Sequence, residues 1–211
     1  MTPLAGIVGV GSGLSAALAR LLASEGYDLV LAARDTAKFT ALTEETGAQA
    51  VALDGSDPAA VAALFKGLER APDVVVYNPS ARVRGPIAEL DPEAVRRAVE
   101  ITGFGAFLTG QAAAKRMLAS APKHGTILFT GAAAGVKGFA QSAPFAMGKF
   151  AQRGLAESMA RELHPKGIHV AWINIDGGIR NPDRPERVDA ADNPDSMLDP
   201  DAIARAYLGL I

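Results

Sequence analysis

Short apolar runs alternate with longer amphipathic stretches along most of this 211-residue chain. The apolar runs are nearly continuous in hydrophobicity and rich in β-branched residues, which is typical of strands buried on both faces of a sheet. They occupy residues 4–10, 28–33, 48–54, 73–78, 125–131 and 168–175. Helical patterns lie between them at 14–25, 36–46, 58–70, 91–119 and 145–163. This alternation predicts an α/β fold with a parallel sheet and right-handed crossovers.

One helical stretch and one polar stretch interrupt this regular pattern. Residues 91–119 form one helix or two, because Thr102, Gly103 and Gly105 break the periodicity. Residues 177–200 are crowded with Pro, Asp and Asn, which predicts a loop, and its length suggests a mobile lid.

The end of the sequence predicts a last helix that runs to the end of the chain. The segment "DPDAIARAYLGLI" offers Asp199 or Asp201 as its N-terminal cap. Residues 1–211 are interpreted as a single domain, since α/β domains of this size are common.

Composition excludes several partners. The formal net charge is −2 and no block of Lys and Arg stands out, so neither nucleic acid nor an anionic membrane is expected as a partner. The sequence contains no cysteine, which removes disulfides, thiolate nucleophiles and Cys-ligated zinc, and no metal site is predicted. The apolar N-terminal stretch has no basic residue before Arg20, unlike a secretory signal, and no apolar run is long enough to span a bilayer. A cytoplasmic location is expected.

A glycine-rich turn follows the first strand and opens the first helix. Gly9, Gly11 and Gly13 allow a tight turn in which backbone N–H groups approach a pyrophosphate at the helix N-terminus. Ser12 and Leu14 complete this predicted cofactor-binding turn. The alternative is a plain strand-to-helix turn, whereas a nucleoside-triphosphate loop is disfavoured because no Gly-Lys-Ser/Thr follows.

The end of the second strand, "LAARD", indicates which dinucleotide binds. An acidic residue at this place would hold the ribose 2′-hydroxyl of NAD, whereas an arginine suits the 2′-phosphate of NADP. Arg34 occupies the place, so NADP(H) is favoured over NAD(H). Asp35 beside it remains an alternative ribose ligand.

These pieces together resemble the short-chain dehydrogenase/reductase family over nearly the whole chain. The matching segments are Gly9-x-x-x-Gly13-x with Ser15 in place of a last glycine, Leu53-Asp54, "YNPS" at 77–80, "ITGFGAFLTGQAA", "GTILFTGAAAG" and "NIDGGI". The resemblance implies a Rossmann-type doubly wound sheet in three layers, with strand order 3-2-1-4-5-6. It also implies that Asp54 meets the adenine and that Asn78, Gly177 and Ile179 line the cofactor site.

The catalytic residues of the family are mostly replaced. The family's asparagine falls on Thr102, its serine on Ala132 and its tyrosine on Phe145, while Lys149 matches the family's lysine. In the family the tyrosine protonates the substrate oxygen, the lysine lowers that tyrosine's pKa and holds the ribose, and the serine steadies the carbonyl. A general acid contributes about 10²–10⁴ in rate and an oxyanion donor about 10²–10³, so ordinary ketone reduction is not expected.

Two other side chains are candidates for supplying the proton. Ser142 lies seven residues before Lys149, a spacing that resembles the enoyl reductases of the same superfamily. Asp176 replaces the proline of the turn after the sixth strand and carries a carboxyl group. Both have an ordinary interpretation as loop or turn residues. Lys149 and Ser142 are the predicted catalytic residues; the three histidines, His124, His164 and His169, are expected at the surface.

Two functions stay open at this point. One is an NAD(P)(H)-dependent oxidoreductase with an altered active site and an unknown small-molecule substrate, which the retention of Lys149 and of the turn 177–179 favours. The other is a non-catalytic NADP(H)-binding sensor or partner subunit. A Rossmann-type methyltransferase is disfavoured, since that class has an acidic residue where this chain has Arg34.

The resemblance also bears on assembly and on the sheet edge. The helices at 103–119 and 145–163 are rich in Ala and Gly and build a dimer interface in the family, so a homodimer or homotetramer is expected. Family members usually continue into a seventh strand, and this sequence stops at Leu210-Ile211. The sixth strand is therefore expected at an edge of the sheet.

Overall fold

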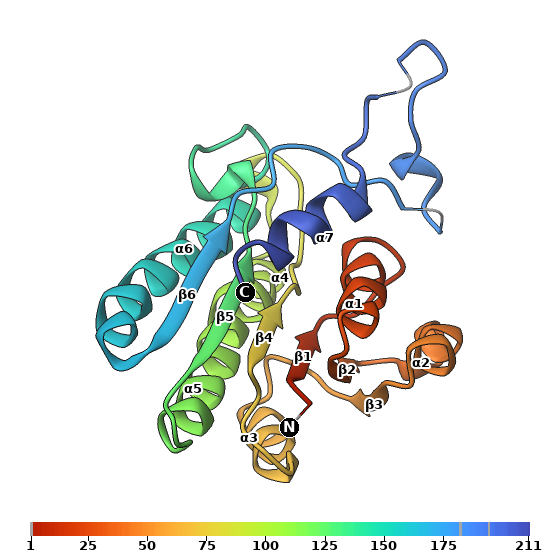
Figure 1. The fold of residues 1–211 in the computed structure, drawn as a ribbon. Helices are drawn as coiled ribbons and strands as arrows, with labels where there is room; N and C mark the ends of the chain where they lie inside the picture. The colour runs from red at the N-terminus through yellow and green to blue at the C-terminus, as the bar shows by residue number, and fades with distance from the viewer. Residues whose placement is uncertain (1, 182, 194) are drawn as a thin grey trace.

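A parallel sheet forms the centre of the computed structural model, which describes residues 2–181, 183–193 and 195–211 (Figure 1). Its strands in the described residues are β1 Leu4–Val8, β2 Asp28–Ala33, β3 Gln49–Ala52, β4 Val74–Tyr77, β5 Gly125–Thr130 and β6 Ile168–Ile173. Their order is β3-β2-β1-β4-β5-β6, and neighbouring strands pair in parallel. The predicted Rossmann-type sheet and its strand order are confirmed.

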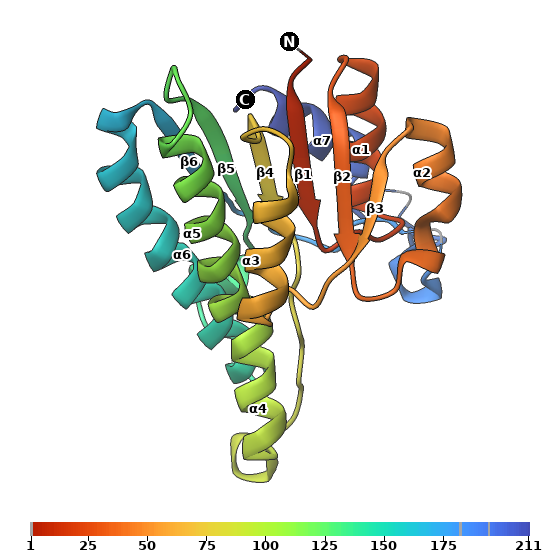
Figure 2. The same ribbon diagram turned by 90° about the horizontal axis from the view of Figure 1, so that it is seen from below.

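Helices cover both faces of this sheet and give the three predicted layers (Figures 1 and 2). One face carries α1 Leu14–Ser24, α2 Thr40–Thr46 and α7 Pro200–Leu208. The other carries α3 Pro58–Gly67, α5 Gly105–Leu118 and α6 Ala143–Leu163. Helix α4, Pro92–Val99, extends beyond the ends of the strands in Figure 2.

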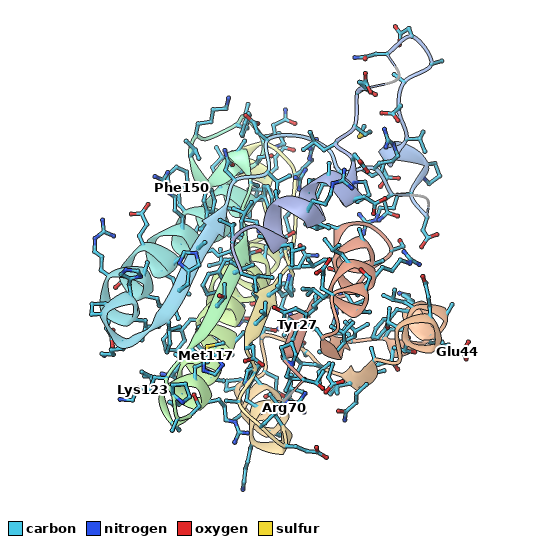
Figure 3. All side chains as sticks on the ribbon, in the orientation of Figure 1. Tyr27, Glu44, Arg70, Met117, Lys123 and Phe150 are labelled. Atoms are coloured by element: carbon cyan, nitrogen blue, oxygen red, sulfur yellow. The ribbon has the colours of Figure 1, made fainter. Side chains whose placement is uncertain are left out.

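Alternating side chains of the central strands supply a core on each face. In β4, Val74 and Val76 pack with α1 and α7, whereas Val75 and Tyr77 pack with α3 and α5. The four residues are buried, which explains why the sequence of this strand is apolar throughout rather than alternating. Side chains fill the space between the layers, while Glu44 points outward from α2 (Figure 3).

Several predicted boundaries differ from the observed ones. The first, third, fourth, fifth and sixth strands end before the predicted 10, 54, 78, 131 and 175, because the chain leaves the sheet there and turns into loops. Helix α6 begins at Ala143, two residues earlier than predicted, since Pro144 fits the first turn of a helix. Helix α7 ends at Leu208 rather than at the end of the chain, and Asp199 caps it by accepting a hydrogen bond from the Asp201 N–H at 3.1 Å.

The stretch predicted as one helix or two is continuous but irregular. A π-helical turn, Glu100–Phe104, joins α4 to α5. The Tyr77 hydroxyl donates to the Ile101 carbonyl within this turn. A Cβ atom on Gly105 would lie 2.6 Å from the Gly55 carbonyl oxygen. The glycine that breaks the sequence pattern therefore marks a close approach of α5 to the loop after β3.

The segment 177–200, called the lid below, follows strand β6, and its mobility stays a prediction. Among the described residues, β6 is the outermost strand on its side of the sheet. Described parts of 177–200 contain a 3-10 turn, Pro185–Arg187, and a parallel bridge between Ile179 and Leu198. In Figure 1 this segment reaches away from the sheet beyond α7. In the part of the chain that the structure describes, no helix is both long and apolar enough to cross a membrane.

Candidate functional site

A cavity of about 680 Å³ opens at the carboxyl ends of the parallel strands. Each strand brings a residue at or just beyond its end to the lining, namely Val8, Ala33, Leu53, Tyr77, Thr130 and Ile175. Ten predicted site residues also line it: Gly9, Gly11, Gly13, Leu14, Arg34, Asp54, Asn78, Lys149, Gly177 and Ile179. The predicted residues Ser12 and Ser142 are not part of the lining. Ligands of doubly wound sheets bind at this end of the strands.

The glycine turn is held in place by two side chains that follow it. Gly9 has a positive φ of 89°, and its N–H donates to the Ala32 carbonyl at 2.8 Å. The Ser15 hydroxyl donates to the Gly9 carbonyl at 3.0 Å, and the Asn78 side-chain amide donates to the Ser15 hydroxyl at 2.6 Å. Asn78, predicted as a cofactor ligand, therefore braces the turn from its place in the cavity wall.

Ser12 ties this turn to the lid. Its hydroxyl donates to the Asn181 side-chain oxygen at 2.8 Å. The same asparagine packs closely on the turn, since a Cβ atom on Gly13 would lie 3.2 Å from its amide nitrogen. Sequence reasoning missed Asn181, which lines the cavity from the segment after β6.

Arg34 lies exposed at the end of β2 and lines the cavity, where the cofactor prediction requires it. Its neighbour Asp35 is engaged in local structure. The Asp35 carboxylate accepts from the Ala37 N–H at 3.2 Å and lies 3.5 Å from the Lys38 ammonium. This engagement disfavours Asp35 as a ribose ligand.

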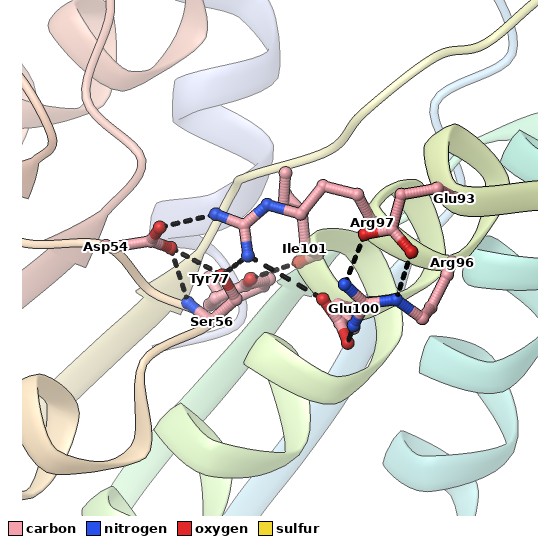
Figure 4. A network of polar contacts seen from close by, with 8 residues as sticks. All are labelled: Asp54, Ser56, Tyr77, Glu93, Arg96, Arg97, Glu100 and Ile101. Atoms are coloured by element: carbon pink, nitrogen blue, oxygen red, sulfur yellow. Dashed lines mark hydrogen bonds and ion pairs between the residues drawn. The ribbon is translucent and has the colours of Figure 1, made fainter.

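Asp54 is held by a network of polar contacts (Figure 4). It accepts from the Ser56 N–H at 2.9 Å and pairs with the Arg97 guanidinium at 2.6 Å. Partial burial opposes ionisation, but the hydrogen bonds from Ser56 and the positive charge of Arg97 lower the pKa of Asp54 to about 2. The carboxylate is therefore ionised and fixed in orientation at neutral pH. Sequence reasoning missed Arg97, which reaches Asp54 from α4.

Lys149 is the most deeply buried cation of the cavity wall, with 2% of its surface exposed. Its ammonium donates to the Thr130 carbonyl and, at 3.3 Å, to the Gln152 side-chain oxygen. The Trp172 indole N–H donates to the same oxygen at 3.2 Å. Burial, together with the positive charge of Arg82, lowers the pKa of Lys149 to about 7. The amine can therefore exchange a proton near neutral pH.

Burial of Lys149 is expected to make stability rise with pH above neutrality. Folding lowers its pKa from 10.5 to about 7, so the unfolded chain binds more protons between these values. The cost of burying the charged amine is complete below the lower value and vanishes above the upper one. The free energy of unfolding is measured by urea denaturation at about pH 6.5 and about pH 9.5. Its rise between these pH values is expected to be larger in wild type than in Lys149→Met by at least about 1 kcal/mol. Lys66→Met, at an exposed lysine, serves as the control, and equal rises in all three proteins would contradict the expectation.

The residues that stand where the family's serine and tyrosine were expected lie together in the cavity. Ala132 and Phe145 both line it, and the Lys149 ammonium is 5.9 Å from the centroid of the Phe145 ring. Thr102 lies outside the lining, and its hydroxyl accepts from the Ala81 N–H at 3.1 Å. Asp176 is exposed and, like Ser142, is not part of the lining. The geometry therefore favours Lys149 over both as the group nearest the chemistry.

Arginines are the main feature that sequence reasoning missed. Arg82, Arg180, Arg184 and Arg187 all line the cavity, the last three from the lid. The sequence did not reveal the charge of the lid, because acidic residues alternate with these arginines along "RNPDRPERVD". Folding separates the two kinds of charge, since the cavity lining takes the arginines and leaves Asp183 and Glu186 outside.

This fold is that of a known family. A family model described as short chain dehydrogenase matches residues 4–183, and the chain belongs to that family. Trans-4-hydroxycyclohexanecarboxylate dehydrogenase of Sinomonas cyclohexanicum is 31% identical over 83% of this chain and 72% of its own length. The cyclic-di-GMP-binding biofilm dispersal mediator protein of Escherichia coli (strain K12) is 31% identical over 78% of this chain and 68% of its own. A crystal structure of BdcA in complex with NADPH superposes with a TM-score of 0.83 at 26% identity, covering 99% of this chain and 86% of that one.

Proposed function

We propose that this protein is an NADP(H)-dependent oxidoreductase with an altered proton donor. The glycine turn, Arg34 and Lys149 would hold NADPH, which would supply a hydride for an electrophilic substrate carbon, while a proton adds to the partner atom. The observation that carries the proposal is the convergence of the glycine turn, Arg34 and Lys149 on one cavity. Membership of the short chain dehydrogenase family supports the same chemistry.

The altered donor follows from what lies at the reacting end of the cavity. Phe145 has no exchangeable proton and Ala132 has no hydroxyl. Asp54, the carboxylate of the described lining, is ionised and was predicted to meet the adenine rather than the substrate. Lys149, with a pKa lowered to about 7, holds a proton that it can release near neutral pH. We assign the proton transfer to this amine, either directly or through water. Its efficiency is lower than that of a phenol placed for the purpose, since the ammonium also donates to the Thr130 carbonyl.

A binding protein without turnover is the second candidate. Two relatives favour it: one is named a cyclic-di-GMP-binding biofilm dispersal mediator, and another, from Xanthobacter autotrophicus (strain ATCC BAA-1158 / Py2), is named an inactive 2-(S)-hydroxypropyl-CoM dehydrogenase. The same replacement of tyrosine by Phe145 that disfavours ketone reduction would suit such a protein.

An NADPH-oxidation screen separates the two candidates. Ketones, diketones, quinones and enoyl compounds are each mixed with protein and NADPH, and absorbance is followed. The screen includes 4-oxocyclohexanecarboxylate, the ketone that corresponds to the substrate in the name of the Sinomonas relative. Turnover that disappears in Lys149→Met supports the oxidoreductase. NADPH binding without turnover of any compound supports the binding protein.

Arg34 is expected to select NADPH over NADH. Its guanidinium is suited to a 2′-phosphate, and a hydrogen bond to a charged group contributes about 1.5–3 kcal/mol. Arg34→Ala is therefore expected to weaken NADPH binding by about tenfold or more and NADH binding by less than about twofold. Titration followed by protein fluorescence measures both. Arg20→Ala, which removes an exposed arginine paired with Glu45, is the control. Equal affinities of the wild type for both cofactors would exclude the preference.

Self-association through α5 and α6 also remains our proposal. Both helices carry exposed large apolar side chains, with Phe107 on α5 and Met147 and Phe150 on α6 being 39%, 53% and 46% exposed. Figure 3 shows Phe150 on the outer side of α6. Pairing of two copies would remove this surface from water, and the mass in solution tests it.

A further inference from the structure

The cavity carries an excess of positive charge that the cofactor site does not use. Its described lining contains five arginines, Arg34, Arg82, Arg180, Arg184 and Arg187, and a single carboxylate, Asp54. Asp54 is already paired with Arg97 at 2.6 Å, and Arg180 is paired with Asp189 at 2.7 Å. Within the described residues, neither Arg82 nor Arg187 has an acidic partner within 4 Å.

Arg82 lies at the reacting end of the cavity. It comes from the loop after β4, and its guanidinium carbon is 4.1 Å from the centroid of the Phe145 ring. The positive charge of Arg82 also acts on Lys149. This is the opposite end of the site from Arg34, the arginine assigned to the cofactor's 2′-phosphate.

Arg187 lines the same cavity from the lid. Its backbone carbonyl accepts from the Asn181 N–H at 2.9 Å, which fixes the 3-10 turn that carries it. Its guanidinium lies against Gly178, where a Cβ atom would be 2.9 Å from one of its nitrogens. Partial removal from water lowers the pKa of Arg82, and the positive charges of Arg187 and Arg84 add to this effect. Two unpaired cations that repel each other across a cavity form a site that an anion stabilises.

We propose that Arg82 and Arg187 bind a carboxylate of the substrate between them, so that this oxidoreductase acts on an oxo acid or hydroxy acid. The inference rests on the proposed function, because it names the substrate class of the same cavity. A carboxylate fits two guanidinium groups through paired hydrogen bonds. Held between the loop after β4 and the lid, it would place the rest of the substrate over Phe145 and Lys149. The other source of a matching anion is a phosphate of the cofactor.

Binding of matched charged and neutral probes tests the arginine pair. Small oxo acids, 4-oxocyclohexanecarboxylate among them, and their neutral ethyl esters are titrated into the protein with and without saturating NADP⁺. At least one oxo acid is expected to bind wild type more tightly than its ester. Arg82→Met and Arg187→Met are each expected to weaken that binding by at least about tenfold and to leave the ester unchanged, because each removes one of the two charges that bind the carboxylate. NADPH affinity is expected to change less than about twofold.

Arg84→Met is the matched control, since Arg84 belongs to the same loop but lies outside the cavity lining. The proposed carboxylate site would be contradicted if Arg84→Met weakened oxo-acid binding as much as Arg82→Met does. It would also be contradicted if the oxo acids bound no better than their esters. If Arg82→Met lost as much affinity for NADPH as for the oxo acid, the arginines would bind the cofactor instead. Failure of wild type to bind NADPH contradicts the proposed function, whereas the titration without cofactor still decides the carboxylate site.

Discussion

Replacing Phe145 with tyrosine and Ala132 with serine is expected to raise the rate of diketone reduction at least about tenfold. Both residues line the cavity beside Lys149, where the two hydroxyl groups are missing. The phenol would stand four residues before Lys149, on the same side of α6, where the amine lowers its pKa. The gain stays below the combined contribution of an acid and an oxyanion donor, because Arg82 still covers the ring face.

The assay is NADPH absorbance with a panel of small diketones, together with a thermal melt that confirms folding. Phe150→Tyr, which adds a hydroxyl to an exposed ring on the same helix, is the matched control and is expected to change nothing. A folded double variant that binds NADPH without any gain would show that the missing acid is not the main deficiency. Rapid turnover of diketones by wild type would show that Lys149 already suffices.

The second large effect is expected from alanine at two glycines of the same turn. At Gly9 the substitution is expected to reduce stability, whereas at Gly11 it is expected to reduce NADPH binding. A Cβ atom on Gly9 would lie 2.6 Å from the Pro79 ring at a φ of +89°. Strain and overpacking there cost about 2–5 kcal/mol, which lowers the melting temperature by at least about 5 °C in a chain of this size. Apart from Gly11 itself and its two chain neighbours, no atom of the described residues lies within 4 Å of a Cβ added to Gly11. Gly11→Ala is therefore expected to leave stability within about 0.5 kcal/mol of wild type but to weaken NADPH binding at least about tenfold.

Thermal melts with and without NADPH measure both consequences, because a ligand that binds the folded state raises the melting temperature. If NADPH raises the melting temperature of Gly11→Ala as much as that of wild type, the pyrophosphate does not approach this turn. Gly9→Ala with an unchanged melting temperature would mean that the loop carrying Pro79 moves aside without cost.

Local sequence determined the fold and most of the cofactor side of the site. Six nearly continuous apolar runs separated by helical patterns are compatible with few arrangements, because strands buried on both faces need helices on both sides. The glycines after β1 and the arginine after β2 lie within a few residues of a strand end. Parallel strands bring all such ends to one edge, so residues predicted one at a time meet there. Boundaries were less certain, since the point at which a strand leaves the sheet depends on its neighbours.

Only the tertiary structure decided which polar groups face the cavity. Ser142 satisfied a spacing but lies outside the lining, because position seven before Lys149 is the residue preceding α6. Asn78 lies in the cavity wall as predicted, but its side-chain amide donates a hydrogen bond to Ser15 at the start of α1. The arginines of the lid alternate with acids along the chain, so their charge cancels in sequence. Folding separates them, and the cavity acquires a positive charge that no stretch of sequence displays.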